Sequence, residues 1–253
     1  MPTNESSVNA TSASPADLGT APAVPTAHSR RTVDAPTRAF HWLTALCFAG
    51  AYATADGERW RLVHITLGYS LVGLVSWRVL WGLLGPRSTR FAGWATRLQA
   101  LPGVLRQLRQ GTWPGTQVQN LGMLLLIVAL LASLTATLAS GWVGDQGFTG
   151  DWIEEVHEFF GNTSLALVGA HIGAVVVLSL LRRRNLAGPM LTGRTPGRGP
   201  DLVARNRGWL AGLMVVAVLG FWLSFGVWQW QTAPAGSLLS APESSQHHGD
   251  DDD

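Results

Sequence analysis

The chain contains no lysine, one cysteine and few charged residues of any kind. Charged residues make up 13% of its 253 residues, whereas a soluble globular domain carries about 25%. This shortage excludes an ordinary water-soluble domain, and together with 12 tryptophans it predicts a membrane protein. The single cysteine, Cys47, excludes an internal disulfide, and we expect it to pack as a small apolar side chain.

Three sequence patterns are also missing, and each absence removes a class of function or processing. Without C-x-x-C-H the chain cannot hold a covalently attached c-type haem. Without H-E-x-x-H it lacks the zinc-binding motif of many metalloproteases. Residues 1–29 lack the apolar core of a secretory signal and are rich in Ala, Ser, Thr and Pro. We therefore expect residues 1–30 to be a disordered cytoplasmic tail.

Five apolar stretches supply the spans that the composition predicts. Most reach the roughly 20 residues that cross a bilayer as a helix, and the first is short unless residues 36–38 extend it. The stretches cover residues 39–55, 62–84, 121–143, 153–181 and 209–230. We expect an all-α integral membrane protein, with a four-helix bundle followed by a fifth transmembrane helix.

The placement of the arginines predicts the orientation in the membrane. All 18 basic residues are arginines, and 15 of them precede the first span or lie in the second-to-third and fourth-to-fifth connections. These segments share one side, which the positive-inside rule makes cytoplasmic. The N-terminus is then inside and the C-terminus outside, as a multi-pass protein of a bacterial inner membrane. The other side is acidic, which either steers a basic soluble partner or reflects a default absence of acids from the inner side.

The connections and tails complete the predicted organisation. Residues 85–117 are an inner-face loop, in which leucines at helical spacing predict a short interfacial helix that breaks near Pro102. Residues 31–193 are the transmembrane core, and residues 194–231 are a loop and the fifth transmembrane helix. Residues 232–253 are expected to be a disordered acidic periplasmic tail.

Four of the seven histidines lie in or beside the apolar spans, where ionisable groups are costly and usually functional. Fourteen residues separate His157 from His171, which is an advance of about 21 Å and a rotation about 40° short of four turns. Both therefore share one face of the fourth span, His157 near the outer side and His171 toward the inner half. By the same topology, His64 lies near the outer side and His41 near the inner side. The depths predict an outer pair, His64 with His157, and an inner pair, His41 with His171.

Two imidazoles that face each other across a helical bundle are typical axial ligands of a b-type haem. The four histidines therefore predict two non-covalent haems b. Haem propionates need cations, and four arginines lie near the predicted pairs, Arg59 and Arg61 on the outer side and Arg38 and Arg78 on the inner side. Arg78 lies inside the second span, where an arginine needs a buried anion. The other three fit ordinary membrane anchors equally well.

Three segments of the chain resemble one known family. They read "APTRAFHWLTALCFAGAY", "ERWRLVHITLGYSLVGLVSWRVLWGLLGPR" and "VHEFFGNTSLALVGAHIGAVVVLSLL". They are similar to the bacterial cytochrome b561 family, which includes the b-type cytochrome subunits of nickel–iron hydrogenases. The resemblance covers residues 31–193 and implies a four-helix core with two haems b, ligated by His41 and His171 on the inner side and by His64 and His157 on the outer side. Relatives often begin the third span with a His-Asn-Pro type of stretch, where this chain has "GTWPGTQVQNLGM", so a quinone pocket there would have different chemistry.

The sequence thus predicts transmembrane electron transfer through two bis-histidine haems b. We expect one partner to be the quinone pool, as ubiquinone or menaquinone. The other is a periplasmic redox partner, either a basic cytochrome or a subunit of a dehydrogenase or hydrogenase, and no nucleic acid is expected. Whether the chain is a quinone-linked oxidoreductase or the membrane anchor of one stays open, as does a homodimer.

The alternative is an intramembrane metal-binding transporter or metalloenzyme that uses the four membrane histidines as zinc or copper ligands. The separation of the two pairs by about 21 Å argues against it, because zinc takes three or four protein ligands at one centre. A plain structural anchor is the third reading, and the four histidines argue against that one.

Overall fold

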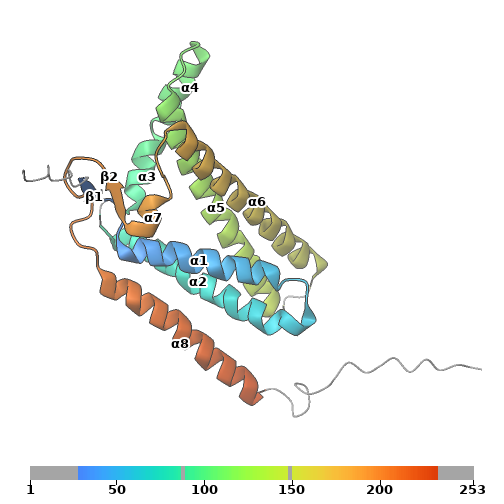
Figure 1. The fold of residues 1–253 in the computed structure, drawn as a ribbon. Helices are drawn as coiled ribbons and strands as arrows, with labels where there is room; N and C mark the ends of the chain where they lie inside the picture. The colour runs from blue at the N-terminus through green and yellow to red at the C-terminus, as the bar shows by residue number, and fades with distance from the viewer. Residues whose placement is uncertain (1–27, 87–88, 148–149, 233–253) are drawn as a thin grey trace, which may run out of the picture.

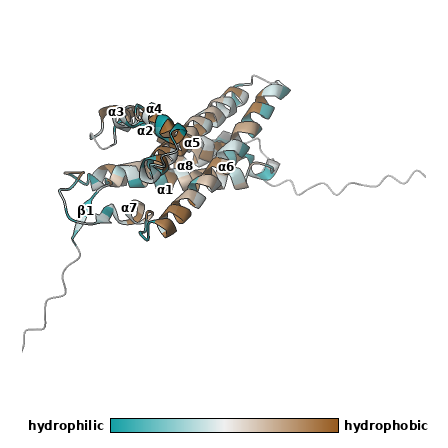
Figure 2. Ribbon diagram, turned by 90° about the horizontal axis from the view of Figure 1, so that it is seen from above, coloured by the Kyte–Doolittle hydropathy of each residue, from teal (hydrophilic) through white to brown (hydrophobic). Residues whose placement is uncertain are grey.

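The computed structural model describes residues 28–86, 89–147 and 150–232, and within them the chain is mostly helical (Figure 1). Four helices are long and apolar enough to cross a membrane: α2 (Arg61–Leu84), α5 (Gly115–Asp145), α6 (Asp151–Leu181) and α8 (Gly208–Thr232). These helices expose many large apolar side chains, and Figure 2 shows hydrophobic residues distributed along the long helices. Exposed apolar surface on this scale indicates contact with lipid or with a partner. The predicted class of all-α membrane protein is confirmed.

Helix α1 (Ala35–Ala53) is a fifth long helix, which packs along α2 and is less apolar than the four above. Asp34 caps its first turn, because its side chain accepts a hydrogen bond from the Thr37 backbone N–H at 3.1 Å. Pro36 fits the same turn, where a backbone N–H has no intrahelical partner to lose. A short 3₁₀ helix, η1 (Glu58–Trp60), precedes α2. The first predicted span is therefore helical, and its crossing of the membrane stays a prediction.

The long helices form two groups. α1 packs with α2 and α8, whereas α5 packs along α6, and the main contact between the groups runs from α2 to α5 (Figure 1). A buried apolar cluster joins the groups and includes Leu71, Leu74, Leu134 and Met214. Cys47 belongs to this cluster as a free thiol that is 1% exposed, which confirms its predicted packing role.

Polar side chains join α5 to α6 at two levels. Near the middle, Ser133 Oγ lies 3.0 Å from Ser164 Oγ. Where α5 begins and α6 ends, Arg182 donates to the Gln119 side-chain oxygen through Nε at 3.0 Å and NH2 at 2.8 Å, and NH2 also donates to Asn120 Oδ1 at 3.0 Å. Small residues let helix backbones approach closely, and interhelical hydrogen bonds fix their rotation. These contacts therefore set the direction in which the histidines of α6 point.

The predicted inner loop contains two short helices instead of one. α3 (Phe91–Leu98) and α4 (Leu101–Arg109) are separated at residues 99–100. Pro102 occupies the first turn of α4, where proline is tolerated, so it begins the second helix and does not end the first. Figure 1 shows α4 projecting from the end of the bundle at which α5 begins.

A two-stranded ribbon ties the start of the chain's described part to the segment after α6. The helix α7 (Gly188–Thr192) is followed by β2 (Arg194–Pro196), which pairs antiparallel with β1 (Ser29–Arg31). The disordered tail expected over residues 1–30 is therefore wrong at Ser29 and Arg30, because ladder hydrogen bonds order them. The rest of that tail, residues 1–27, and all but the start of the acidic C-terminal tail lie outside the described residues.

Candidate functional site

Two pairs of histidines face each other between the helix groups. The His64 imidazole on α2 lies 6.0 Å from the His157 imidazole on α6, measured between ring centroids. The His41 imidazole on α1 lies 6.5 Å from the His171 imidazole, which is also on α6. These are the two pairs that helix geometry predicted, and we name them the outer pair and the inner pair after their predicted depths. α6 contributes one imidazole at each level because its fourteen-residue interval returns to the same face.

The separations are those of two rings that share one metal atom. A metal–imidazole bond is about 2 Å long, and the ring centre lies about 1 Å beyond the bonded nitrogen, so the centroids of two axial imidazoles are about 6 Å apart. The ring planes are inclined by 77° in the outer pair and by 54° in the inner pair, so neither pair is stacked face to face. Ligation of one metal by each pair is compatible with the helix positions as they stand.

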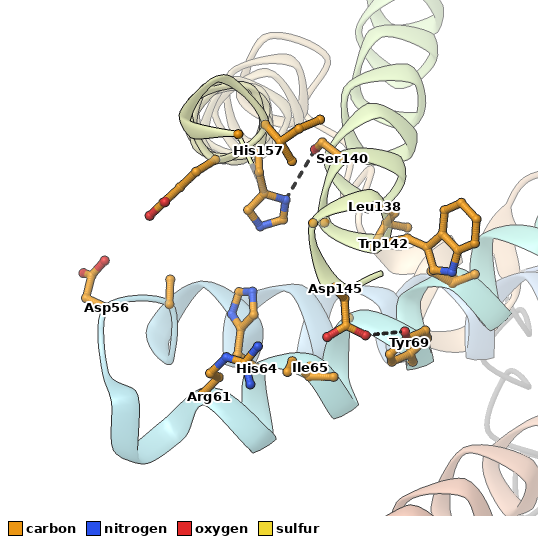
Figure 3. Close-up of a pocket in the computed structure, with 18 of the residues that line it drawn as sticks. Asp56, Arg61, His64, Ile65, Tyr69, Leu138, Ser140, Trp142, Asp145 and His157 are labelled. Carbon is orange, nitrogen blue, oxygen red and sulfur yellow. Dashed lines mark hydrogen bonds between the residues drawn. The ribbon is translucent and has the colours of Figure 1, made fainter. Parts of the chain in front are cut away.

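A cleft of about 1010 Å³ opens between α2, α5 and α6 at the outer pair. Figure 3 shows His64 and His157 pointing toward each other across it, with Arg61 and Asp56 at its edge. Cofactor and ligand pockets commonly span about 300–1,000 Å³. The cleft is therefore large enough for a planar cofactor between the two rings.

Backbone carbonyls hold both imidazoles of the outer pair. The Nδ1 atom of His64 lies 2.8 Å from the Ala51 carbonyl oxygen, and Nδ1 of His157 lies 2.9 Å from that of Thr137. A carbonyl only accepts, so each Nδ1 carries the proton and donates it. The Nε2 atom then keeps its lone pair for a metal, which is the usual arrangement of a metal-binding histidine.

Gly141 of α5 makes room for the outer imidazole. A Cβ at this position would lie 2.8 Å from His157 Cε1 and 3.0 Å from Nδ1, closer than ordinary contact. Four other glycines lie close in sequence to His64, His157 or His171, at positions 68, 161, 169 and 173, but an added Cβ at any of them meets nothing within 4 Å. Sequence reasoning missed Gly141, because only the packing of α5 on α6 brings it to the imidazole.

The inner pair has a different polar environment. Both of its Nδ1 atoms are buried and have no hydrogen-bond partner. Four further buried side-chain atoms in the described part of the chain also lack a partner, and they are Thr37 Oγ1, Arg38 Nε, Thr44 Oγ1 and Arg78 NH1. Thr37, His41 and Thr44 follow a helical spacing on α1, so they share one face. Buried polar atoms are normally satisfied, and this concentration of spare donors around one pair indicates a site for a polar group.

The contacts between α1 and α2 place Arg78 close to the inner level. His64 contacts Ala51, and the Trp81 indole donates to Asp34 at 3.2 Å. In this antiparallel alignment Arg78 lies opposite Thr37, one helical turn from the level of His41.

The four predicted arginines differ in their contacts. Arg78 lies 4.6 Å from the ring centroid of Phe91 and 4.9 Å from that of Trp94, with NH1 spare. Arg38 donates from NH1 to the Leu191 carbonyl at 2.9 Å, with Nε spare. Arg61 lines the outer cleft, whereas Arg59 is not among its lining residues and lies 5.9 Å from the Trp60 ring centroid.

The described residues contain no group of three or more His, Cys, Asp and Glu side chains able to hold a metal ion. A zinc site normally requires three or four such ligands. The four histidines instead form two separate pairs. Each pair supplies two imidazoles, and a bis-histidine haem iron takes two axial ligands from the protein.

Comparison with protein families favours haem binding over a zinc or copper site and over a plain structural anchor. The family model for prokaryotic cytochrome b561 matches residues 32–193. The chain belongs to this family. Comparisons with curated proteins and with solved structures find no match. Membership implies binding of b-type haem and electron transfer across a membrane, and it confirms the resemblance drawn from the sequence.

The residues of this b561 chain fit a b-type haem at each histidine pair. Each imidazole pair has the spacing of two axial ligands, and the outer pair lies in a cleft of sufficient size. Arg38 and Arg78, which the alignment of α1 and α2 places near the inner pair, each have a buried guanidinium nitrogen without a partner that could bind a propionate. α8 lies beyond the matched region and packs on α1 and α2, away from the histidines of α6.

Proposed function

We propose that the protein carries single electrons across a bacterial inner membrane by means of two bis-histidine haems b. His41 and His171 ligate the inner haem, and His64 and His157 ligate the outer haem. Haem iron supplies reversible one-electron chemistry, which no side chain of the pairs provides by itself. The observation that carries the proposal is the separation of the ring centroids, 6.0 Å and 6.5 Å, in a chain of this family.

The surrounding residues orient the ligands and hold the propionates. The carbonyls of Ala51 and Thr137 fix the outer imidazoles in the tautomer that leaves Nε2 free. Arg61 lines the outer cleft and neutralises a propionate there. Arg38 and Arg78 do so on the inner side through their spare nitrogens. Arg59 acts as a membrane anchor at the outer surface, where its contact is with Trp60.

The topology that we propose has five spans, with the N-terminus inside and the C-terminus outside. Helix α1 is the first span, although it is less apolar than the other four. Its arginine and histidine are used by the inner site, which offsets the cost of placing them in the membrane. The arginine-rich segments before α1, between α2 and α5, and between α6 and α8 support the orientation.

The partners that we propose are the quinone pool, as ubiquinone or menaquinone, and a basic periplasmic redox protein. The acidic lining of the outer cleft supports the second, because it attracts a basic partner to the mouth of the outer site. The "GTWPGTQVQNLGM" stretch gives the quinone little support, because Gln119 and Asn120 bind Arg182. The chain is either an oxidoreductase in its own right or the membrane anchor of a dehydrogenase or hydrogenase.

Single histidine variants test the ligand assignment. We expect His157→Ala and His171→Ala each to retain one haem per chain, measured as the pyridine haemochrome of detergent-purified protein. His28→Ala is the matched control, since it removes an imidazole that precedes the helices, and it should retain both haems. Two haems per chain in either of the first two variants would refute the assignment.

A further inference from the structure

The outer histidine pair lies in an acidic cleft. Four carboxylate side chains and one guanidinium line it. They are Asp56, Asp145, Asp151 and Glu154, with Arg61 as the cation. Figure 3 shows Asp145 beside the cleft, where it accepts a hydrogen bond from the Tyr69 hydroxyl at 2.6 Å. Negative charge therefore predominates around this pair.

Positive charge predominates near the inner pair. Arg38 precedes His41 by three residues, and Arg78 lies one helical turn from the level of His41. Each of these arginines has a buried guanidinium nitrogen without a hydrogen-bond partner. One buried carboxylate, Asp34, opposes them, and its oxygens already accept from the Thr37 N–H and the Trp81 indole.

The outer and inner imidazoles also differ in their hydrogen bonds. Both outer Nδ1 atoms donate to backbone carbonyls, and neither inner Nδ1 has a partner. The contact of His157 with Thr137, together with that of Ser133 with Ser164, sets the alignment of α5 on α6. That alignment brings residues 123–126, a methionine and three leucines, to the level of His171. The residues of α5 at the level of the inner pair are therefore apolar by sequence, whereas at the outer pair α5 offers the Thr137 carbonyl and the Ser140 hydroxyl.

We propose that these residues give the outer site a lower reduction potential than the inner site, so that an electron on the protein resides mainly at the inner, cytoplasmic side. The inference rests on the proposed function. Ferric haem with two neutral imidazoles carries one more positive charge than ferrous haem. Carboxylates therefore stabilise the oxidised state in the outer cleft, and arginines stabilise the reduced state on the inner side.

The imidazole hydrogen bonds act in the same direction. Donation from Nδ1 to a carbonyl makes the ring a more basic ligand, which favours the ferric state of the outer site. At the inner site neither Nδ1 has an acceptor, so the ferric state there lacks this stabilisation. Exchange of one electron between the sites oxidises one iron and reduces the other, with no proton or bond involved. We expect at least a tenfold preference for the inner site, which corresponds to about 59 mV for a one-electron couple.

The test is a spectroelectrochemical titration of the full-length protein in detergent, which should resolve two one-electron components. Two adjacent glutamates of α6 identify the outer one, because Glu154 lines the cleft and Glu155 does not. In Glu154→Gln the lower midpoint should rise, and in Glu155→Gln both midpoints should stay in place. A response of the higher midpoint to Glu154→Gln, or one common midpoint in the native protein, would overturn the proposal.

Arginine variants test the inner site independently. In Arg78→Gln the higher midpoint should fall, whereas Arg109→Gln, which removes an exposed arginine of α4, should leave both unchanged. If Arg78→Gln does not accumulate as folded protein, Arg38→Gln serves in its place. A fall in the lower midpoint would overturn the order of the sites. Two haems in the reversed order refute only this inference, whereas a protein without two haems refutes the proposed function as well.

Discussion

Replacement of Gly141 by alanine tests how closely α5 approaches the outer imidazole. The added Cβ would lie 2.8 Å from His157 Cε1, and ordinary contact begins at 3.4 Å, so the ring must move by about 0.6 Å. The same movement strains the 2.9 Å hydrogen bond from Nδ1 to the Thr137 carbonyl. Overpacking of this kind costs about 1–3 kcal/mol.

That cost should appear as weaker binding at the outer site. Because about 1.4 kcal/mol is tenfold in an equilibrium constant, the affinity for the outer haem should fall by about 5- to 150-fold. The assay is the rate and extent of haem transfer from the purified protein to an excess of apomyoglobin. One of the two haems should leave faster, and its ferric low-spin EPR signal should shift as the ring turns.

Gly122→Ala is the matched control for this experiment. It lies on the same helix, gains the same helix propensity, and its added Cβ meets nothing within 4 Å. We expect its haem transfer and its EPR spectrum to be those of the native protein. If Gly141→Ala behaves in the same way as Gly122→Ala, the close approach of α5 to the ligand of the outer haem is wrong.

Two further predictions concern arginines. Arg182→Ala removes the hydrogen bonds that join the start of α5 to the end of α6, and should lower the free energy of unfolding by about 1–3 kcal/mol. Thermal unfolding in detergent measures this change. Arg183→Ala, which truncates the exposed neighbouring arginine, should change the free energy of unfolding little. Arg61→Gln should speed loss of the outer haem in the transfer assay, because Arg61 lines the cleft, whereas Arg59→Gln should not. If Arg183→Ala destabilised the protein as much as Arg182→Ala, the hydrogen bonds of Arg182 would not join the two helices as described. If Arg59→Gln sped haem loss as much as Arg61→Gln, the special position of Arg61 in the cleft would be wrong.

The histidine pairs could be predicted from sequence because their geometry is local. A separation of fourteen residues on one helix puts His157 and His171 on a common face, and the distribution of arginines predicts the depth of each histidine. The pairing of His64 with His157 and of His41 with His171 then follows without knowledge of the packing.

Other features depend on contacts between distant segments and could not be predicted. The role of Gly141 depends on how far α5 slides along α6. The aromatic neighbours of Arg78 come from α3, which folds back from the inner loop onto α2. Beside the β1–β2 ribbon, the hydroxyls of Thr32 and Thr195 are hydrogen-bonded although the two residues are 163 positions apart. The periodicity of residues within one segment does not indicate which distant segments that segment contacts.

The haem content of the native protein tests the central claim most directly. The full-length chain is purified in detergent after expression with an ample supply of haem. Its reduced-minus-oxidised spectrum is recorded, and the pyridine haemochrome is related to the protein concentration from amino-acid analysis. The account predicts a b-type spectrum with two haems per chain. One haem per chain would contradict the assignment of one histidine pair, and a chain without haem would contradict the account as a whole.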